Sequence, residues 1–350
     1  MLKKKILKFG KSFDDLDEIK KDFFVENDKL LEKANVIRKI YKSQPIRRKC
    51  KACNRKLKNA SFFISHQIKY IECQNCGHLN GKYQDTKNFT NKIYFSKTIN
   101  YSKDYYEKNL KNFLLRKKLI YNPKAKFLSD IFLKNKKIKI LDIGAGSGYF
   151  ISSLIDFGFK NVEGLEVSRQ QVQFGKKMFK KNHQDLEKLN CTNYTDILKK
   201  INKTNADCVT LIGVLEHLNN MRSFLSVIEK NRSIKYVFLC APLFSLTCIF
   251  ESLFDEIYNR HLGGGHTHLF TESSLKRLMK EYGFRSYAEW WFGSDFGDLY
   301  RSIKILLRKR KFFSLQKKIE PIKKLIDQFQ LTIDKKKLSS EVHIFFKRKR

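Results

Sequence analysis

Apolar runs alternate with amphipathic stretches through the middle of the chain. Residues 138–143 form a short apolar run with one lysine in it, which is typical of a buried parallel strand, and an apolar helical stretch begins at Tyr149. The alternation continues to Gly283. We therefore predict an α/β fold with a doubly wound, mostly parallel sheet of seven strands. The expected strands are residues 138–143, 162–167, 189–191, 207–212, 236–242, 285–291 and 341–346.

The pattern outside this sheet divides the chain into further units. Helical periodicity that ends at Pro45 predicts an N-terminal arm, and helical spacing over residues 246–258 predicts a helix that either covers a pocket or packs in the core. The predicted units are a helical arm (1–45), a small cysteine-containing unit (46–82), a Tyr- and Lys-rich connector with a helix over 105–120 (83–126), the main α/β domain (127–291), a basic helical insertion (292–338) and the final edge strand (339–350).

Four cysteines in the small unit form two Cys-x-x-Cys pairs, Cys50 with Cys53 and Cys73 with Cys76, separated by 19 residues. This spacing is typical of a zinc ribbon, which brings four thiolates into a tetrahedron around Zn²⁺. We predict a structural zinc site, because four protein ligands leave no position for a substrate. The chain shows no signal-peptide pattern and no apolar run of about 20 residues, so we expect a cytoplasmic protein without disulfides or a transmembrane segment.

A glycine-rich segment, Gly144-Ala145-Gly146-Ser147-Gly148, joins the first strand of the sheet to its helix. Its third glycine comes one residue earlier than in the dinucleotide fingerprint Gly-x-Gly-x-x-Gly, and the phosphate loop Gly-x-x-x-x-Gly-Lys-Ser/Thr is absent. These differences favour a nucleotide-like ligand without a pyrophosphate. Glu166 ends the next strand about twenty residues further on, where an acid can accept hydrogen bonds from both ribose hydroxyls.

Together with the preceding Leu141-Asp142-Ile143, the glycine segment resembles the first motif of the class I S-adenosylmethionine (SAM)-dependent methyltransferases. The segment from Gly213 to Leu218, which contains Leu-Glu-His after the fourth strand, is a second match to that family. The resemblance implies SAM as cofactor. The cofactor-binding residues that we expect are Asp142, Gly144, Ala145, Gly146, Gly148, Glu166, Val167, Asn193, Gly213 and Leu215.

An acceptor hydroxyl would need a base to remove its proton, and histidines near the cleft can supply one. We expect His217 to be this catalytic base, with His268 and His266 as further candidates; a structural role for His217 is the alternative. Some methyltransferases of this type bind Mg²⁺ through Glu-x-x-Glu-His. Here Gly213 stands in place of the first glutamate, which argues against a metal at this position.

The formal net charge of +37 is compatible with a nucleic-acid partner or with peripheral contact to an anionic membrane. Most lysines, however, are spread along the chain, and dense basic clusters occur only at the ends and around residues 308–311. The order of the parts resembles bacterial methyltransferases associated with sugar and surface-polysaccharide biosynthesis, which implies a small-molecule or glycan acceptor. The alternatives are a zinc-ribbon RNA methyltransferase and a non-catalytic binding protein on the same fold.

Overall fold

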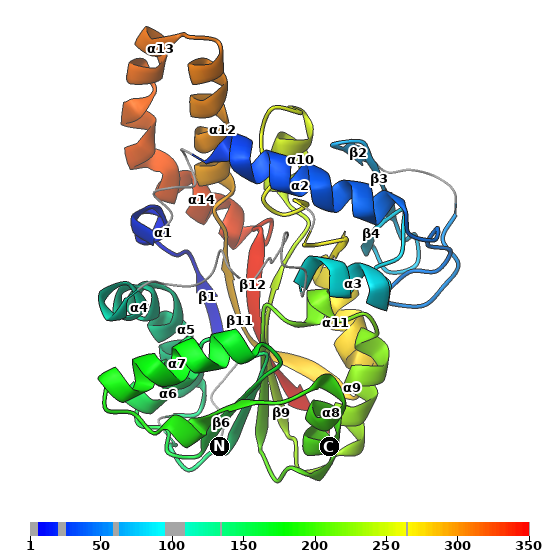
Figure 1. Ribbon diagram of the computed structural model, residues 1–350, viewed down its shortest axis with the longest axis vertical. Helices are drawn as coiled ribbons and strands as arrows, with labels where there is room; N and C mark the ends of the chain where they lie inside the picture. The colour runs from blue at the N-terminus through cyan, green and yellow to red at the C-terminus, as the bar shows by residue number, and fades with distance from the viewer. Residues whose placement is uncertain are drawn as a thin grey trace.

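An eight-stranded sheet forms the centre of the molecule in the computed structural model, which describes residues 6–19, 26–58, 63–94, 109–133, 135–263 and 265–349 (Figure 1). The strand order is β1-β11-β12-β9-β8-β5-β6-β7. Neighbouring strands are parallel, except that β12 is antiparallel to both β9 and β11. The strands are β1 (Ile6–Phe9), β5 (Ile140–Ile143), β6 (Val162–Glu166), β7 (Leu189–Cys191), β8 (Cys208–Ile212), β9 (Tyr236–Pro242), β11 (Phe284–Phe292) and β12 (Glu341–Arg348).

The predicted doubly wound α/β sheet is confirmed, but it has eight strands where the sequence pattern predicts seven. The additional strand is β1, which lies in the arm predicted to be helical and pairs in parallel with β11. Trp290 holds it there: its indole N–H donates to the Gly10 carbonyl over 2.9 Å, and Lys8 Nζ lies 3.6 Å from its ring centroid. Four residues with one lysine are too few to show a strand pattern in the sequence.

Helices cover both faces of the sheet. The elements are α1 (Phe13–Ile19), α2 (Asn27–Lys42), α3 (Lys87–Tyr94), α4 (Leu110–Arg116), a π-helical turn (Lys117–Tyr121), α5 (Asn122–Ile131), α6 (Tyr149–Asp156), α7 (Arg169–Lys181), α8 (Tyr194–Lys203), η5 (Leu215–His217), α9 (Met221–Lys230), α10 (Leu246–Ser252), α11 (Glu272–Glu281), α12 (Asp295–Lys309), α13 (Phe313–Lys318), η6 (Glu320–Leu325) and α14 (Ile326–Lys335), with short 3₁₀ turns between some of them. Residues 105–108 of the predicted connector helix lie outside the described residues.

Side chains that alternate along the strands separate two hydrophobic cores. On β9, Val237 and Leu239 face one core together with residues of α8, α9 and α11, whereas Phe238 faces the other core with α4 to α7. Because both faces are covered, the central strands are apolar nearly throughout, which is why their positions are visible in the sequence.

The cysteine-containing unit forms a second, four-stranded sheet with the order β10-β4-β3-β2. Its own strands are β2 (Phe63–Ser65), β3 (Ile68–Glu72) and β4 (Leu79–Gly81). The fourth strand, β10 (His268–Leu269), comes from the main part of the chain and pairs with β4 in antiparallel orientation. The small unit and the main part therefore share a sheet, and Ile37 and Tyr41 of α2 pack against it.

The basic segment before β12 forms a helical hairpin, in which α12 leads away from the sheet and α13, η6 and α14 lead back to it (Figure 1). Among the described residues, there is no helix with the length and apolar character needed to cross a membrane.

Candidate functional site

The loops that follow β5 and β8 touch at the carboxyl ends of these neighbouring strands, where the strand order reverses and doubly wound sheets bind ligands. Gly144 has a φ of +68°, and a Cβ atom there would lie 2.6 Å from Cγ2 of Val214. Only glycine tolerates both this left-handed φ and this close approach to Val214. The first glycine of the motif therefore lets the two loops approach each other.

Glu166, at the end of β6, lies beside the glycine loop. Its Oε2 accepts a hydrogen bond from the Gly146 N–H over 2.9 Å, and its Oε1 accepts one from the Ser168 N–H over 2.8 Å. Burial raises the pKa of the Glu166 carboxyl, while these backbone donors favour the ionised form. The carboxylate is thus fixed in orientation by two loops and keeps further lone pairs to accept hydrogen bonds from ribose hydroxyls.

Several of the other predicted cofactor contacts are buried or already make hydrogen bonds within the protein. Asp142 is buried and accepts a hydrogen bond from the Thr210 hydroxyl over 2.5 Å; burial raises the pKa of Asp142 to about 7. Leu215 is buried in the core, and the Asn193 side chain accepts from the Asp196 N–H as the N-cap of α8. Ala145 donates its N–H to the Leu165 carbonyl, and Gly148 is the N-cap residue of α6.

The exposed parts of this region are the loop ends. Val167 follows Glu166 with 43% of its surface exposed, and Gly144 and Gly213 are exposed as well. An oriented carboxylate beside a glycine loop and an exposed apolar residue fits SAM, which offers a ribose, an adenine ring and a charged amino-acid end. Glu166 would hold the ribose, Val167 would contact the adenine ring, and the backbone of the glycine loop would border the amino-acid end.

Two of the candidate histidines come together beyond the end of β8. The rings of His217, in η5, and His266 lie with their centroids 4.9 Å apart, and both residues are half-buried. Burial, His266 and Lys51 hold the pKa of His217 well below its usual range, and burial lowers the pKa of His266 to about 4. Both rings are therefore neutral near pH 7. Nδ1 of His266 donates to the His261 carbonyl over 2.9 Å, which leaves its Nε2 with a lone pair.

His268 is placed differently. It is completely buried in β10, and its Nδ1 shares a hydrogen bond of 2.9 Å with Nε2 of His78. Burial holds the pKa of His268 well below its usual range. With no exposed surface, His268 cannot contact an acceptor in this conformation, and its partner His78 instead ties the small sheet to the main part of the chain.

Glu216 adds a carboxylate to the pair of histidines. Glu216, His217 and His266 offer ligand atoms that all lie within 4.8 Å of one another, so the group could hold a divalent cation. Burial raises the pKa of Glu216 to about 8, and its Oε2 has no hydrogen-bond partner among the described residues. The sequence motif lacks the glutamate that Gly213 replaces, but His266, 49 residues beyond His217, brings a third ligand that local spacing cannot reveal.

Lys51 connects the cysteine unit with this region, and sequence reasoning missed it. It stands between Cys50 and Cys53, its Nζ is paired with Asp85, and its charge contributes to the lowered pKa of His217. Arg47 pairs with the same aspartate over 2.6 Å. No signal in the sequence identifies Lys51 among so many lysines, because what distinguishes it is a side chain with only 4% of its surface exposed.

The four cysteines form one cluster. The Sγ atoms of Cys50 and Cys76 are 3.7 Å apart and those of Cys53 and Cys73 are 3.6 Å apart, close to the edge of about 3.8 Å expected for a tetrahedron with Zn–S bonds of about 2.3 Å. The hydrogen bond between Cys50 and Cys76 lowers the pKa of Cys50 and raises the pKa of Cys76, so this pair favours one thiolate and one thiol. Asn54 and Gly77, directly after the two Cys-x-x-Cys pairs, both have left-handed φ values that close the turns. The donor set fits Zn²⁺.

The cysteine cluster is attached to α9 and α11. Arg222 of α9 donates to the Ala52 carbonyl over 2.8 Å, and Ser273 of α11 donates to the Cys76 carbonyl over 3.1 Å. A folded cluster therefore helps to position α9 and α11, and with them the segment that carries His266 and His268.

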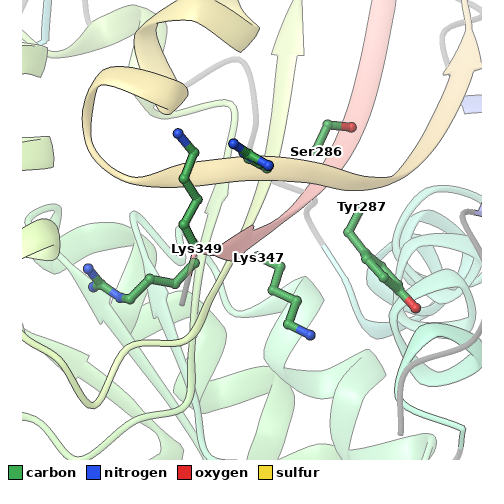
Figure 2. A pocket seen from close by; sticks show the side chains of 6 residues that line it. Ser286, Tyr287, Lys347 and Lys349 are labelled. Carbon is green, nitrogen blue, oxygen red and sulfur yellow. The ribbon is translucent and has the colours of Figure 1, made fainter.

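An open pocket of about 410 Å³ lies elsewhere, beside β11 and β12. Figure 2 shows Ser286 and Tyr287 of β11 and, on the neighbouring strand end, Lys347 and Lys349. Phe346 and Lys347 of β12 pair with Val237 and Tyr236, at the start of β9. The pocket is thus at the amino ends of the parallel strands, opposite the predicted cofactor residues, and we assign no role in catalysis to it.

Comparison with known proteins supports the interpretation of the glycine loop. Residues 115–289, half of the chain, match the family described as "Methyltransferase domain". A comparison with curated proteins gave no match. Similar solved structures include the methyltransferase domain of a bacterial CtHen1 protein (TM-score 0.42, 16% identity, covering 65% of this chain and 98% of that chain), a SAM-dependent methyltransferase from Archaeoglobus fulgidus (0.42, 15%, 67% and 99%) and the magnesium protoporphyrin IX methyltransferase of Synechocystis PCC 6803 (0.46, 11%, 75% and 100%).

The matched residues include the glycine loop, Glu166 and the Glu216–His217 tip, all at the carboxyl ends of the parallel strands β5, β6 and β8. This chain therefore belongs to the methyltransferase domain family and is a SAM-dependent methyltransferase.

Proposed function

We propose that this enzyme methylates a hydroxyl group of a sugar or another small-molecule acceptor, in the biosynthesis of a glycan such as a surface polysaccharide. The observation that carries the proposal is the pair of neutral histidines, His217 and His266, next to the cofactor loops. A hydroxyl is a poor nucleophile unless its proton is removed, and a neutral imidazole is suited to this task.

In this proposal, one set of residues orients the cofactor and another removes the proton of the acceptor. SAM, when bound, supplies an activated methyl group. Glu166 and the glycine loop orient the cofactor. Val214, which lies against Gly144, and the buried Leu215 lead directly to His217 in η5. His217 takes the proton of the acceptor hydroxyl. His266, whose Nδ1 donates to the His261 carbonyl, provides a second neutral imidazole with its ring centroid 4.9 Å from that of His217. Holding the acceptor in line with the methyl group provides most of the remaining acceleration.

We also propose that Cys50, Cys53, Cys73 and Cys76 bind a structural Zn²⁺. The supporting observations are the two Sγ–Sγ distances and the contacts of the cluster with α9 and α11. Four thiolates around one ion leave no open position for a substrate. The role of the zinc is therefore to hold β10, α9 and α11 in place.

An RNA acceptor remains the competing proposal for the substrate. The buried cations of the ribbon offer it little support, because Arg47 and Lys51 are both bound to Asp85. An RNA-binding surface would instead need exposed cations that release counterions when they meet phosphates, and this makes affinity fall steeply with salt.

Transfer of a labelled methyl group from SAM into a cell extract tests the proposal. The extract is separated into nucleotide-sugar, glycan, RNA and protein fractions after incubation with the zinc-loaded enzyme. We expect label in the nucleotide-sugar or glycan fraction, and His217→Gln should reduce it strongly without weakening SAM binding. Label in the RNA fraction alone would contradict a sugar acceptor, and full activity of His217→Gln would contradict its role as the base.

A further inference from the structure

The far end of the helical hairpin is both basic and apolar on its surface. Residues 308–315, which read Arg-Lys-Arg-Lys-Phe-Phe-Ser-Leu, span the end of α12, the turn after it and the start of α13, and all are exposed. Phe312 and Phe313 have 50% and 57% of their surface exposed, and Leu315 has 45%. Ile322 and Leu325 of η6 add 43% and 41%. We call residues 308–325 the hairpin tip. Large apolar side chains gathered at such a position mark a site of interaction.

Positive charge surrounds these apolar side chains. Residues 303–325 contain nine Lys or Arg residues and a single acid, Glu320. Glu320 is already bound to Lys304 over 2.7 Å and to the Tyr300 hydroxyl over 2.8 Å, on the side of α12. Lys309 also pairs with Asp28 of α2 over 2.6 Å. The cations of the tip still outnumber the acids, so the tip is positively charged and an anionic partner would complement it.

Buried ion pairs fasten the base of the hairpin to the rest of the molecule. Arg301 of α12 binds Glu251 of α10 over 2.7 Å, with 1% of each side chain exposed. One turn earlier, Asp298 binds Arg260 over 2.7 Å. Asp295, at the start of α12, accepts hydrogen bonds from the backbone of Thr247 and of Ser340. These contacts fix the direction in which the hairpin presents its tip.

The same contacts relate the hairpin to the catalytic region. α10 follows the carboxyl end of β9, and Arg260 is adjacent to His261, whose carbonyl holds the ring of His266. The base of the hairpin and the two histidines thus lie at the same end of the sheet. In Figure 1 the hairpin extends from this end and away from the helices that flank the sheet.

We infer that the hairpin tip docks the enzyme onto a membrane surface that carries anionic lipids. Lipid phosphates would attract the cations, and Phe312, Phe313 and Leu315 would enter the boundary between head groups and acyl chains. A nucleic acid would use the cations but would leave the aliphatic side chains in water. The combination of exposed aliphatic and aromatic side chains with cations at a projecting end therefore favours a membrane. This inference goes beyond the proposed function and holds for any acceptor of the enzyme.

Flotation with lipid vesicles tests the inference on the full, zinc-loaded chain. Vesicles of phosphatidylcholine are compared with vesicles that also contain phosphatidylglycerol, at low and high salt. We expect binding to the anionic vesicles only, with a loss of about 10-fold or more for Phe312→Ser/Phe313→Ser and for Arg310→Gln/Lys311→Gln, and a loss at high salt. The matched control, Val36→Ser/Ile64→Ser, removes two exposed apolar side chains elsewhere and should bind like the wild type.

Three results would overturn the inference: no flotation of the wild type with anionic vesicles, unchanged flotation of the Phe312→Ser/Phe313→Ser variant, or equal loss in the control variant. Binding of a labelled single-stranded RNA that weakens with Arg310→Gln/Lys311→Gln but not with Phe312→Ser/Phe313→Ser, together with no flotation, would assign the tip to nucleic acid instead. SAM affinity, measured on every variant, should not change. An unchanged SAM affinity shows that the variants are folded. It also distinguishes a failure of this inference from a failure of the proposed function.

Discussion

The Gly146 N–H donates a hydrogen bond to Oε2 of Glu166 over 2.9 Å, joining the loop after β5 to the end of β6. The other carboxylate oxygen accepts from Ser168, at the start of α7. Glu166 is therefore oriented before any ligand arrives. A carboxylate fixed in this way can bind a ribose without first losing side-chain freedom, which favours affinity.

Glu166→Gln should weaken SAM and S-adenosylhomocysteine binding by roughly 10- to 100-fold, because hydrogen bonds to a charged group contribute about 1.5–3 kcal/mol. Isothermal titration calorimetry measures the change. Glu163→Gln is the matched control, since Glu163 lies on the same strand but pairs with Lys200 over 3.1 Å, away from the glycine loop. Equal affinities for the wild type and Glu166→Gln would remove the ribose assignment.

The pH dependence of kcat/KM should report a base with a lowered pKa. A histidine base works in its neutral form, and burial lowers the pKa of His266 to about 4 and that of His217 well below its usual range. Activity should therefore persist as the pH falls through 6.5, the range in which an ordinary histidine gains its proton. His183→Gln, at an exposed position on the surface, should leave the profile unchanged. An acid limb centred near pH 6.5 in the wild type would show that neither His217 nor His266 is the base.

The stability of the protein should depend on pH through Glu216. Burial raises its pKa to about 8 in the folded state, from an ordinary value near 4.5, so the folded protein binds a proton that the unfolded chain releases. This contribution to stability is complete below about pH 4.5 and is lost as the pH rises through about 8. Urea unfolding from pH 5 to pH 9 should show a shallower decline for Glu216→Gln than for the wild type. Glu229→Gln on α9 is the control, and parallel curves for wild type and Glu216→Gln would contradict the prediction.

Zinc removal should disturb the region of His217 and His266 as well as the cysteine-containing unit. The purified protein should contain one zinc ion per chain, and Cys50→Ser should lower both the zinc content and the thermal stability. Methyl transfer should fall too, because the cysteine-containing unit carries Lys51 and its strand β4 pairs with β10. Cys191→Ser, at an exposed cysteine outside the cluster, should change neither quantity. Elemental analysis and thermal unfolding decide the matter: full stability of the zinc-free protein would end the structural role.

The sequence pattern predicts the centre of the fold well, because the central strands are buried on both faces. β6, β7 and β9 lie within a residue of the expected ranges, and the loop after β5 follows directly from its glycines. The pattern does not predict β1 and β10, which have four and two residues. Both become strands only because a partner strand is already in place, and such short segments carry no periodicity of their own.

In the candidate site, too, the sequence predicts local features but not those that depend on tertiary packing. Neighbours in sequence such as Glu216 and His217 can be found from a motif, and Glu166 from its distance to the glycine loop. The approach of His266 to His217 depends on the long segment after β9, and the burial of His268 depends on His78 in the ribbon. These relationships arise from tertiary packing, which is why His268 looked equivalent to His266 in the sequence and is not equivalent in the structure.

Equilibrium binding of SAM to the zinc-loaded wild-type protein tests the central claim most directly. Calorimetry should show one SAM bound per chain with micromolar affinity, displaced by S-adenosylhomocysteine and lost or greatly weakened in Glu166→Gln. Absence of SAM binding by the folded, zinc-loaded protein would contradict the assignment of the glycine loop and Glu166 as a methyltransferase cofactor site.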